Sequence, residues 1–275
     1  MTPTLKARAV VYEDRTPTRF IAVTHGVFGR GTNWLTFARA LVRRLPDLGV
    51  LLVDLRLHGE SPGGSGPHTI AAAALDLASL EVPHGGHLVG VLGHSLGGKI
   101  ALAFAEPSHP TLRHAWIVDS MPGPSAGEDG EGQRVLRLLR SLPEEFPDRR
   151  TFVSAVIDAG ETEAVATWLS MNLRAEGDGY RWGLDLDGIE ELLRSFHATD
   201  LWPTVEGPRE GLTVHLIVGG ASAAFDEPAR KRALAAKGPN TRVTIVEGAG
   251  HWVHVDALDT LVNVVASDLR GTDAD

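Results

Sequence analysis

The 275-residue chain contains no cysteine. This absence excludes disulfides, cysteine-ligated zinc and catalysis by a thiol. No stretch of about 18 or more apolar residues is present, so we expect no helix that spans a membrane. The N-terminal residues contain no apolar segment of the kind that signal peptides have, so we expect no signal peptide. The absence of cysteine fits a cytoplasmic protein.

Positive charge is also scarce. The chain has 26 Lys and Arg residues against 35 Asp and Glu residues, so its formal net charge is -9. An acidic balance argues against nucleic acid or an anionic membrane as the main partner. The length allows one large domain, or a domain that carries an inserted subdomain. The composition does not determine an oligomeric state.

Short apolar runs alternate along the chain with stretches of helical periodicity. The runs predicted to be strands lie at 5–12, 20–25, 50–55, 87–93, 114–120, 212–220 and 241–248, and the core helices at 31–45, 68–80, 96–106 and 255–269. This alternation predicts βαβ units and a mostly parallel sheet with helices on both faces. Functional sites in such sheets lie beyond the carboxyl ends of the strands.

Residues 121–206 interrupt this alternation. They contain no strong strand pattern, and their helical patterns lie near 131–142, 145–158, 161–173 and 187–197. The length of the region favours a helical cap, inserted in a core formed by residues 1–120 and 207–275, over ordinary crossover helices. A glycine-rich stretch at 123–132 is expected to be flexible.

Ser95 lies between Gly93 and Gly97, after an apolar run and before a helical one. A serine hydroxyl becomes a nucleophile when a sharp strand-to-helix turn exposes it to a base. The chain nearly touches itself in such a turn, so glycine is needed on both sides. The Gly-x-Ser-x-Gly spacing is weak by itself. Its position between strand and helix predicts a nucleophile rather than an incidental serine in a turn.

The predicted base is His251, which follows the run 241–248 after a short glycine turn. His254, three residues later in the first turn of the last helix, is the alternative. No carboxylate or third histidine lies at ligand spacing from this pair, so we do not expect a zinc site.

The acidic partner of the base is less well determined. In many proteins with a nucleophilic serine on such a sheet, the acid that pairs with the histidine follows the strand that corresponds to the run 212–220. Here that run is followed by Ala-Ser-Ala at 221–223. Asp119 ends another apolar run, where a carboxylate is costly to bury unless it is paired. A histidine N–H would pair it and fix the tautomer that catalysis needs. We therefore favour Asp119, with Asp226, an expected helix N-cap, and Asp187 as alternatives.

An oxyanion formed at Ser95 needs two backbone donors. One is the N–H of Leu96, directly after the nucleophile, and the other is expected in the loop after 20–25. Val27 is the preferred donor there, with Phe28 second. Residues 54–61 are read as scaffold beneath the site, with Asp54 and Arg56 as a possible ion pair.

Five motifs, HGVFGRGTNW, DLRLHGES, GHSLGGK, IVDSMP and GAGHWVH, occur in this order. Together they resemble the α/β-hydrolase fold superfamily, and most closely its small acyl-esterase family of ybfF-type esterases and mitochondrial abhydrolase-domain proteins. The resemblance covers residues 5 to 270. It implies an α/β-hydrolase fold with a mostly parallel eight-stranded sheet, a nucleophile at Ser95, a base at His251 and no cofactor or metal. Leu57 departs from the asparagine that the family has at this point.

The resulting hypothesis is a carboxylesterase that cleaves esters or thioesters of small to medium acyl groups through an acyl-enzyme. Phe28, Trp168, Met171 and Trp182 are the predicted substrate-binding residues; for the last three the alternative is packing within the cap. Two further enzymes could use the same residues, a carbon–carbon bond hydrolase and a menaquinone-pathway-type lyase. A hydrolase-like receptor without catalysis is the third alternative, although such proteins usually lack the serine or the histidine.

Overall fold

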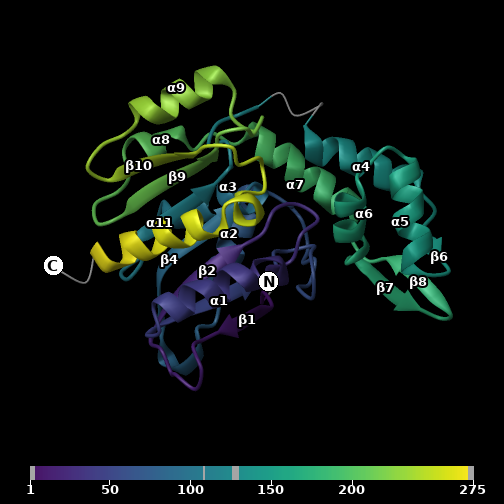
Figure 1. Cartoon of the computed structure of the whole chain (residues 1–275), viewed down its shortest axis with the longest axis horizontal. Coiled ribbons are helices and arrows are strands. Elements are labelled where there is room, and N and C mark those ends of the chain that lie inside the picture. The colour runs from purple at the N-terminus through teal and green to yellow at the C-terminus, as the bar shows by residue number, and fades with distance from the viewer. Residues whose placement is uncertain (1–3, 108, 126–129, 272–275) are drawn as a thin grey trace.

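The computed structural model describes residues 4–107, 109–125 and 130–271, and a seven-stranded sheet forms its centre (Figure 1). The strand order is β1-β3-β2-β4-β5-β9-β10. The strands are β1 (Ala7–Val10), β2 (Arg19–Thr24), β3 (Leu48–Val53), β4 (His87–His94), β5 (His114–Val118), β9 (Thr213–Gly219) and β10 (Thr241–Val246). Strand β1 pairs antiparallel with β3, and all other neighbours pair in parallel. The sheet is therefore mostly parallel, as predicted.

The sheet has one strand fewer than the eight that we expected. Each of the seven apolar runs forms one strand, and no eighth segment of the described residues joins the sheet. After β1 the chain turns back, with the N–H of Arg15 donating to the carbonyl of Tyr12 at 3.1 Å, and leads directly into β2. Strand β1 therefore lies at the edge of the sheet and pairs with β3 alone.

Helices cover both faces of the sheet. Alternate residues of a strand point to opposite faces. Val50 and Leu52 of β3 accordingly pack with α1 (Leu35–Arg44) and α11 (Leu258–Gly271), while Leu51 and Val53 pack with α2 (Ile70–Ala78) and α3 (Leu96–Ala105). The remaining helices outside the β5–β9 connection are short: η1 (Gly31–Trp34), η2 (Pro83–Gly85), α9 (Glu227–Ala235) and α10 (Val253–Asp256). In the described residues, no helix combines the length and the apolar character needed to cross a bilayer.

The connection from β5 to β9 holds a second group of elements, which we call the β5–β9 segment (residues 130–206). Its helices are α4 (Glu131–Ser141), α5 (Arg149–Asp158), α6 (Glu163–Ser170), α7 (Leu186–Ala198) and α8 (Trp202–Glu206). The first four correspond to the four predicted helical patterns. The apolar cluster beneath α2 and α3 continues into this segment, so the two parts share a core.

The β5–β9 segment also contains a small antiparallel sheet that the sequence did not reveal. Its strand order is β6-β8-β7, from Glu145–Phe146, Gly179–Trp182 and Leu173–Glu176. Strands of two to four residues are too short to produce a recognisable alternation of polar and apolar residues. The predicted boundaries of the cap stay a prediction, and residues 126–129 of the glycine-rich stretch lie outside the described residues.

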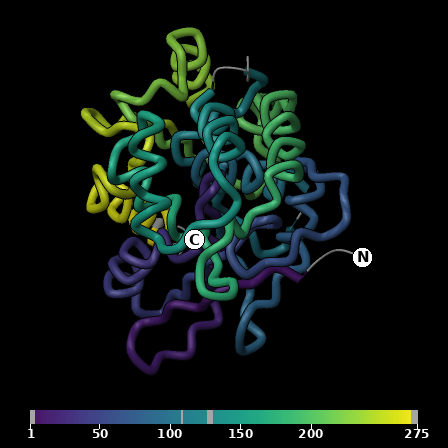
Figure 2. Tube along the Cα trace, turned by 90° about the vertical axis from the view of Figure 1, so that its right-hand side faces the viewer, coloured from purple at the N-terminus to yellow at the C-terminus, as the bar shows by residue number. Residues whose placement is uncertain are grey.

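The β5–β9 segment faces one end of the main sheet. Figure 2, which looks at the right-hand side of Figure 1, shows its teal and green helices in front of the core. Residues after β2, β4, β5, β9 and β10 line one cavity together with residues of α4, α6 and α7. The segment therefore lies over the carboxyl ends of the parallel strands, where a functional site was expected.

Candidate active site

A cavity of about 510 Å³ lies between the carboxyl ends of the strands and the β5–β9 segment. Ser95, Asp119 and His251, which are far apart in sequence, all line it. They follow β4, β5 and β10 respectively. The fold thus brings the three residues that we favoured from the sequence to one site.

Ser95 occupies a tight turn between β4 and α3. Its backbone angles are φ 52° and ψ -121°, a conformation that residues with side chains rarely adopt. A side-chain carbon added to Gly93 would lie 2.1 Å from the carbonyl oxygen of Gly97, and one added to Gly97 would lie 2.4 Å from that of His25. Glycine is therefore required on both sides of Ser95, as predicted.

Asp119 and His251, which both line the cavity, pair with each other. The His251 Nδ1–H donates to Asp119 Oδ2 at 2.6 Å. The same carboxylate accepts hydrogen bonds from the N–H of Gly219 at 2.9 Å and from Ser222 Oγ at 2.5 Å, and the residue is 1% exposed. Because Nδ1 carries the proton in this pair, Nε2 of a neutral His251 is left as an acceptor.

Ser222 is a polar residue of this site that the sequence analysis did not identify. It lies just after β9, within the Ala-Ser-Ala that stands where an acid was expected. Its hydroxyl donates to Asp119, and the N–H of Ala224 donates to the hydroxyl in turn at 3.1 Å. The available signal was a hydroxyl, that of Ser222, at the position where an acid was expected. This hydroxyl donates to the carboxylate of Asp119, which follows the neighbouring strand β5.

The alternative acids lie elsewhere. Asp226 caps α9 and accepts a hydrogen bond from the N–H of Ala229 at 2.8 Å, which agrees with its predicted role as an N-cap. Asp187 pairs with Arg140, and its side chain is 93% exposed. Neither residue lines the cavity.

His254, the alternative base, lies beside His251 in α10 and also lines the cavity. Its ring stacks on Trp34 at 4.2 Å between centroids, and burial lowers its pKa to about 4. His94 is buried behind the same pair, and its Nε2 donates to the carbonyl oxygen of His251 at 2.8 Å. Burial holds the pKa of His94 well below its usual range, so these two rings add no positive charge beside His251.

The two predicted oxyanion donors border the same space. The N–H of Leu96 is the first of α3, so it has no partner within the helix and lies at the positive end of the helix dipole. In the loop after β2, the N–H of Phe28 is already donated to His58 Nε2 at 3.0 Å. This leaves Val27, which also lines the cavity, as the better of the two candidates there.

The predicted substrate-binding residues divide into two groups. Phe28 and Trp168 line the cavity, and Trp168 contacts Trp252 with ring centroids 5.4 Å apart. Met171 and Trp182 are not among the lining residues. Met171 is 38% exposed, and Trp182 stacks on Phe152 at 5.6 Å inside the β5–β9 segment. The apolar wall instead includes residues that the sequence did not single out: Met121, Val135, Val165, Leu193 and Phe196.

The cavity carries little charge. Among the described residues that line it, none is Lys or Arg, and the only carboxylates are those of Asp119 and Glu131. In the described ranges no group of three or more His, Asp or Glu residues could hold a metal ion. The arrangement therefore offers a hydroxyl, a histidine–carboxylate pair and backbone donors beside an apolar wall.

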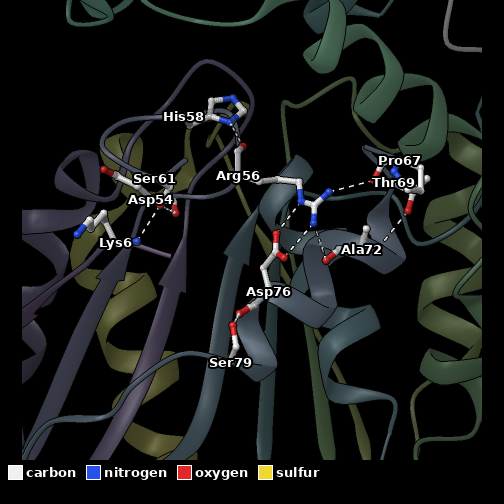
Figure 3. A network of polar contacts seen from close by, with 10 residues as sticks. All are labelled: Lys6, Asp54, Arg56, His58, Ser61, Pro67, Thr69, Ala72, Asp76 and Ser79. Atoms are coloured by element: carbon white, nitrogen blue, oxygen red, sulfur yellow. Dashed lines mark hydrogen bonds and ion pairs between the residues drawn. The ribbon is translucent and has the colours of Figure 1, made fainter. Parts of the chain in front are cut away.

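Polar contacts hold the loop after β3 beyond the carboxyl ends of the strands, as Figure 3 shows. Arg56 binds Asp76 through two hydrogen bonds, of 2.6 and 2.9 Å, and both side chains are at most 4% exposed. The suggested pairing of Asp54 with Arg56 is therefore wrong. Asp54 instead accepts hydrogen bonds from the backbone N–H groups of Gly31 and Glu60, because its place at the end of β3 brings it to these two turns.

Comparison with known proteins gives a consistent family match. Residues 21–264 match the family model described as "Alpha/beta hydrolase family". The chain is 30% identical over 258 residues to sn-1-specific diacylglycerol lipase ABHD11 of Mus musculus, covering 90% of this chain and 80% of that protein. It is 22% identical over 264 residues to esterase YbfF of Escherichia coli strain K12, covering 95% of this chain and 97% of that protein.

A synthase and a solved esterase structure are also similar. The chain is 26% identical over 264 residues to a putative 2-succinyl-6-hydroxy-2,4-cyclohexadiene-1-carboxylate synthase of Bacillus subtilis strain 168, covering 90% of this chain and 89% of that protein. A solved structure of a marine microorganism esterase superposes with a TM-score of 0.78 at 20% identity, covering 96% of this chain and 99% of that one. The structural likeness at this identity establishes the shared fold.

Proposed function

The chain belongs to the alpha/beta hydrolase family, and from this premise we propose that it is a carboxylesterase acting on uncharged esters or thioesters. Ser95 is the proposed nucleophile, His251 the base and Asp119 its acidic partner. The observation that carries the proposal is the buried hydrogen bond of 2.6 Å between Asp119 and His251, in the same cavity as the strained turn of Ser95.

In the proposed reaction, Ser95 Oγ attacks the carbonyl carbon of the ester while His251 Nε2 takes the hydroxyl proton. The carbonyl oxygen becomes an oxyanion that accepts hydrogen bonds from the N–H groups of Leu96 and Val27. The carbon–oxygen bond to the alcohol then breaks, and His251 gives its proton to the leaving oxygen. A water molecule, activated by the same histidine, hydrolyses the acyl-enzyme and regenerates Ser95.

The cavity favours an apolar acyl group of small to medium length. Its volume of about 510 Å³ is typical of a small-molecule site. Since no Lys or Arg is found among its described lining residues, it offers no counter-charge to a carboxylate-bearing substrate. This observation favours an uncharged ester over the kind of compound named for the Bacillus subtilis synthase, which is a carboxylate.

The proposal extends to organisation and location. Residues 121–206 form the proposed cap over a core of residues 1–120 and 207–275, and the Val27 and Leu96 N–H groups form the proposed oxyanion hole. A cytoplasmic location is part of the proposal, and fractionation of cells that produce the protein tests it.

A series of p-nitrophenyl esters from acetate to laurate tests the activity. We expect kcat/KM to be highest between butyrate and octanoate, and Ser95→Ala to reduce hydrolysis to background. A fluorophosphonate should label the wild type once, at Ser95. Ser141→Ala is the matched control, because the hydroxyl of Ser141 is exposed on α4 and bonds only to its own helix. Folded wild-type protein that neither hydrolyses the esters nor reacts with the probe would support the receptor alternative instead.

A further inference from the structure

The Val27 N–H belongs to the turn Gly26–Gly29. The carbonyl of Gly26, which is in the same peptide unit as this N–H, has two hydrogen-bond partners. The carbonyl oxygen of Gly26 accepts a hydrogen bond from the N–H of Gly29 at 3.0 Å and lies 2.7 Å from His25 Nδ1. The C=O of Gly26 and the N–H of Val27 are parts of one planar trans peptide and point in opposite directions. Holding the carbonyl therefore fixes the direction of the N–H.

Phe28, the next residue of this turn, is strained and is held on both of its backbone polar atoms. Its φ of 62° lies in the left-handed region, which is unfavourable for a residue with a large side chain. Its N–H donates to His58 Nε2 at 3.0 Å, and its carbonyl accepts from Asn172 Nδ2 at 2.7 Å. Both partners are buried, with His58 0% and Asn172 4% exposed.

The hydrogen bonds of His58 define its tautomer. His58 Nδ1 lies 2.8 Å from the carbonyl oxygen of Arg56. Figure 3 marks this hydrogen bond with a dashed line, and a carbonyl only accepts, so this nitrogen carries the proton. Nε2 is then free to accept the N–H of Phe28. Burial lowers the pKa of His58 to about 4, which keeps the ring in this neutral form near neutral pH.

Asn172 differs from His58 because it comes from the β5–β9 segment. It lies between α6 and β7, where its N–H donates to the carbonyl of Leu169 at 3.0 Å and its own carbonyl accepts from Gly183 at 3.1 Å. Its side-chain amide then reaches across to the loop after β2. Only the NH₂ group can donate to a carbonyl, so the contact with Phe28 fixes the orientation of the amide.

We call the turn Gly26–Gly29 the oxyanion turn, because it carries the proposed donor, the N–H of Val27. We propose that Asn172 is a positioning residue for this turn, which it holds through the carbonyl of Phe28. Together with His58 it keeps Phe28 in its left-handed conformation, and the Val27 N–H keeps its direction as a result. The placement of the β5–β9 segment is thereby coupled to the oxyanion donor of the core. This inference rests on the proposed function, because the turn matters only if an oxyanion forms at Ser95.

Asn172→Leu tests the inference, because leucine has a similar volume but no donor. We expect kcat per titrated active site to fall about 10- to 100-fold, since loss of a single oxyanion donor costs about 100- to 1,000-fold and the donor here is only displaced. KM should stay within about twofold. The inhibition constant of an acyl trifluoromethyl ketone, whose adduct carries an oxyanion, should rise in proportion to the fall in kcat.

Arg174→Gln is the matched control. Arg174 also reaches from the β5–β9 segment to the core, where it donates to the carbonyl of Gly59 at 3.2 Å, but it has no hydrogen bond to the turn. We expect its kcat and its inhibition constant to stay within about twofold of wild type. Asn172→Ala, which introduces no bulk, replaces the leucine variant if that protein does not fold.

The outcomes separate this inference from the proposed function. If wild-type protein lacks esterase activity, the proposed function fails first. If wild-type protein is active and the folded Asn172 variant keeps both its kcat and its affinity for the ketone, only the role of Asn172 is refuted. A lower number of active sites with unchanged kcat per site would likewise refute it, because that result indicates a structural role alone.

Discussion

Asp119→Asn removes the charge of the buried carboxylate and keeps the shape of its side chain. In the native site the carboxylate accepts three hydrogen bonds, from His251 Nδ1–H, the N–H of Gly219 and Ser222 Oγ. An asparagine can keep the bond from Gly219 through its oxygen, but its NH₂ group then faces His251. Two donors cannot pair, so we expect His251 to adopt the other tautomer. In that tautomer Nε2 carries the proton and Nδ1 accepts a hydrogen bond from the asparagine.

The magnitude follows from this change of tautomer. With the proton on Nε2, His251 cannot accept the proton of Ser95, and the side chain of residue 119 has no exposure through which water could compensate. We expect kcat to fall about 10⁴-fold, as such a replacement does in a serine protease, which is about 5.4 kcal/mol of lost transition-state stabilisation. KM should change little, because the replaced group does not touch the substrate.

The assay is hydrolysis of p-nitrophenyl butyrate under saturating conditions, with Asp226→Asn as the control. Asparagine is as good an N-cap as aspartate, so this control should keep full activity and nearly full stability. The reasoning is refuted if folded Asp119→Asn retains more than about a tenth of the wild-type kcat, because loss of the tautomer leaves no route to such a rate.

Three further results are expected. Ser222→Ala deletes one donor to the buried carboxylate and should lower kcat about 10-fold, or about 1.4 kcal/mol, in the same ester assay; an unchanged kcat would contradict the positioning role. Arg56→Met leaves a buried carboxylate unpaired and should cost about 3–5 kcal/mol in urea unfolding, whereas Arg232→Ala, at a half-exposed ion pair, should cost less than about 1 kcal/mol. Burial lowers the pKa of both His58 and His114 to about 4, so the unfolded chain binds more protons than the folded one between their ordinary pKa of about 6.5 and pH 4. The free energy of unfolding should therefore be highest above about pH 6.5 and fall by on the order of 1–2 kcal/mol per histidine at pH 5. His114→Phe removes one of these histidines, so the urea midpoint of this variant should depend less steeply on pH.

The parts of the site that depend on local geometry could be predicted from the sequence. Gly93 and Gly97 flank Ser95 because the chain closes on itself over a few residues, and that requirement leaves a spacing in the sequence. Asp119 could be inferred because a carboxylate at the end of an apolar strand needs a partner. The structure places His251 at hydrogen-bond distance from it.

Contacts made by backbone carbonyls left no such signal. Lys99 is fully buried, and its Nζ donates to the carbonyls of Gly123, Phe196 and Thr199, at 2.8, 2.6 and 3.1 Å. Any residue can supply a carbonyl, so the sequence could not show that this lysine ties α3 to the chain before the β5–β9 segment and to the last part of that segment. The contact of Asn172 with the carbonyl of Phe28 was hidden for the same reason.

The direction in which a side chain points was the other feature that could not be predicted from the sequence. Trp168 and Trp182 are both tryptophans in the predicted cap, and nothing in the sequence distinguishes their roles. In the structure Trp168 lies on α6 and lines the cavity, whereas Trp182 ends β8 and packs on Phe152. The small sheet that decides this difference was itself invisible in the hydrophobic pattern.

Backbone strain recurs at three residues of the proposed site. Phe28, Ser95 and Asp119 all have positive φ, and each lies just beyond one of the adjacent strands β2, β4 and β5. Such a conformation costs about 1–3 kcal/mol at each residue, so the surrounding structure must hold it in place. The N–H of Ser95 donates to Val118, and that of Asp119 donates to Ile217, which extends the parallel pairing past the strand ends. Because Ser95 and Asp119 are each tied to the next strand, the register of the sheet sets the spacing between the proposed nucleophile and the acid. The turn that contains Phe28 depends instead on side chains from outside the sheet. The turn is therefore the part of the site whose geometry the β5–β9 segment can alter without disturbing the Asp119–His251 pair.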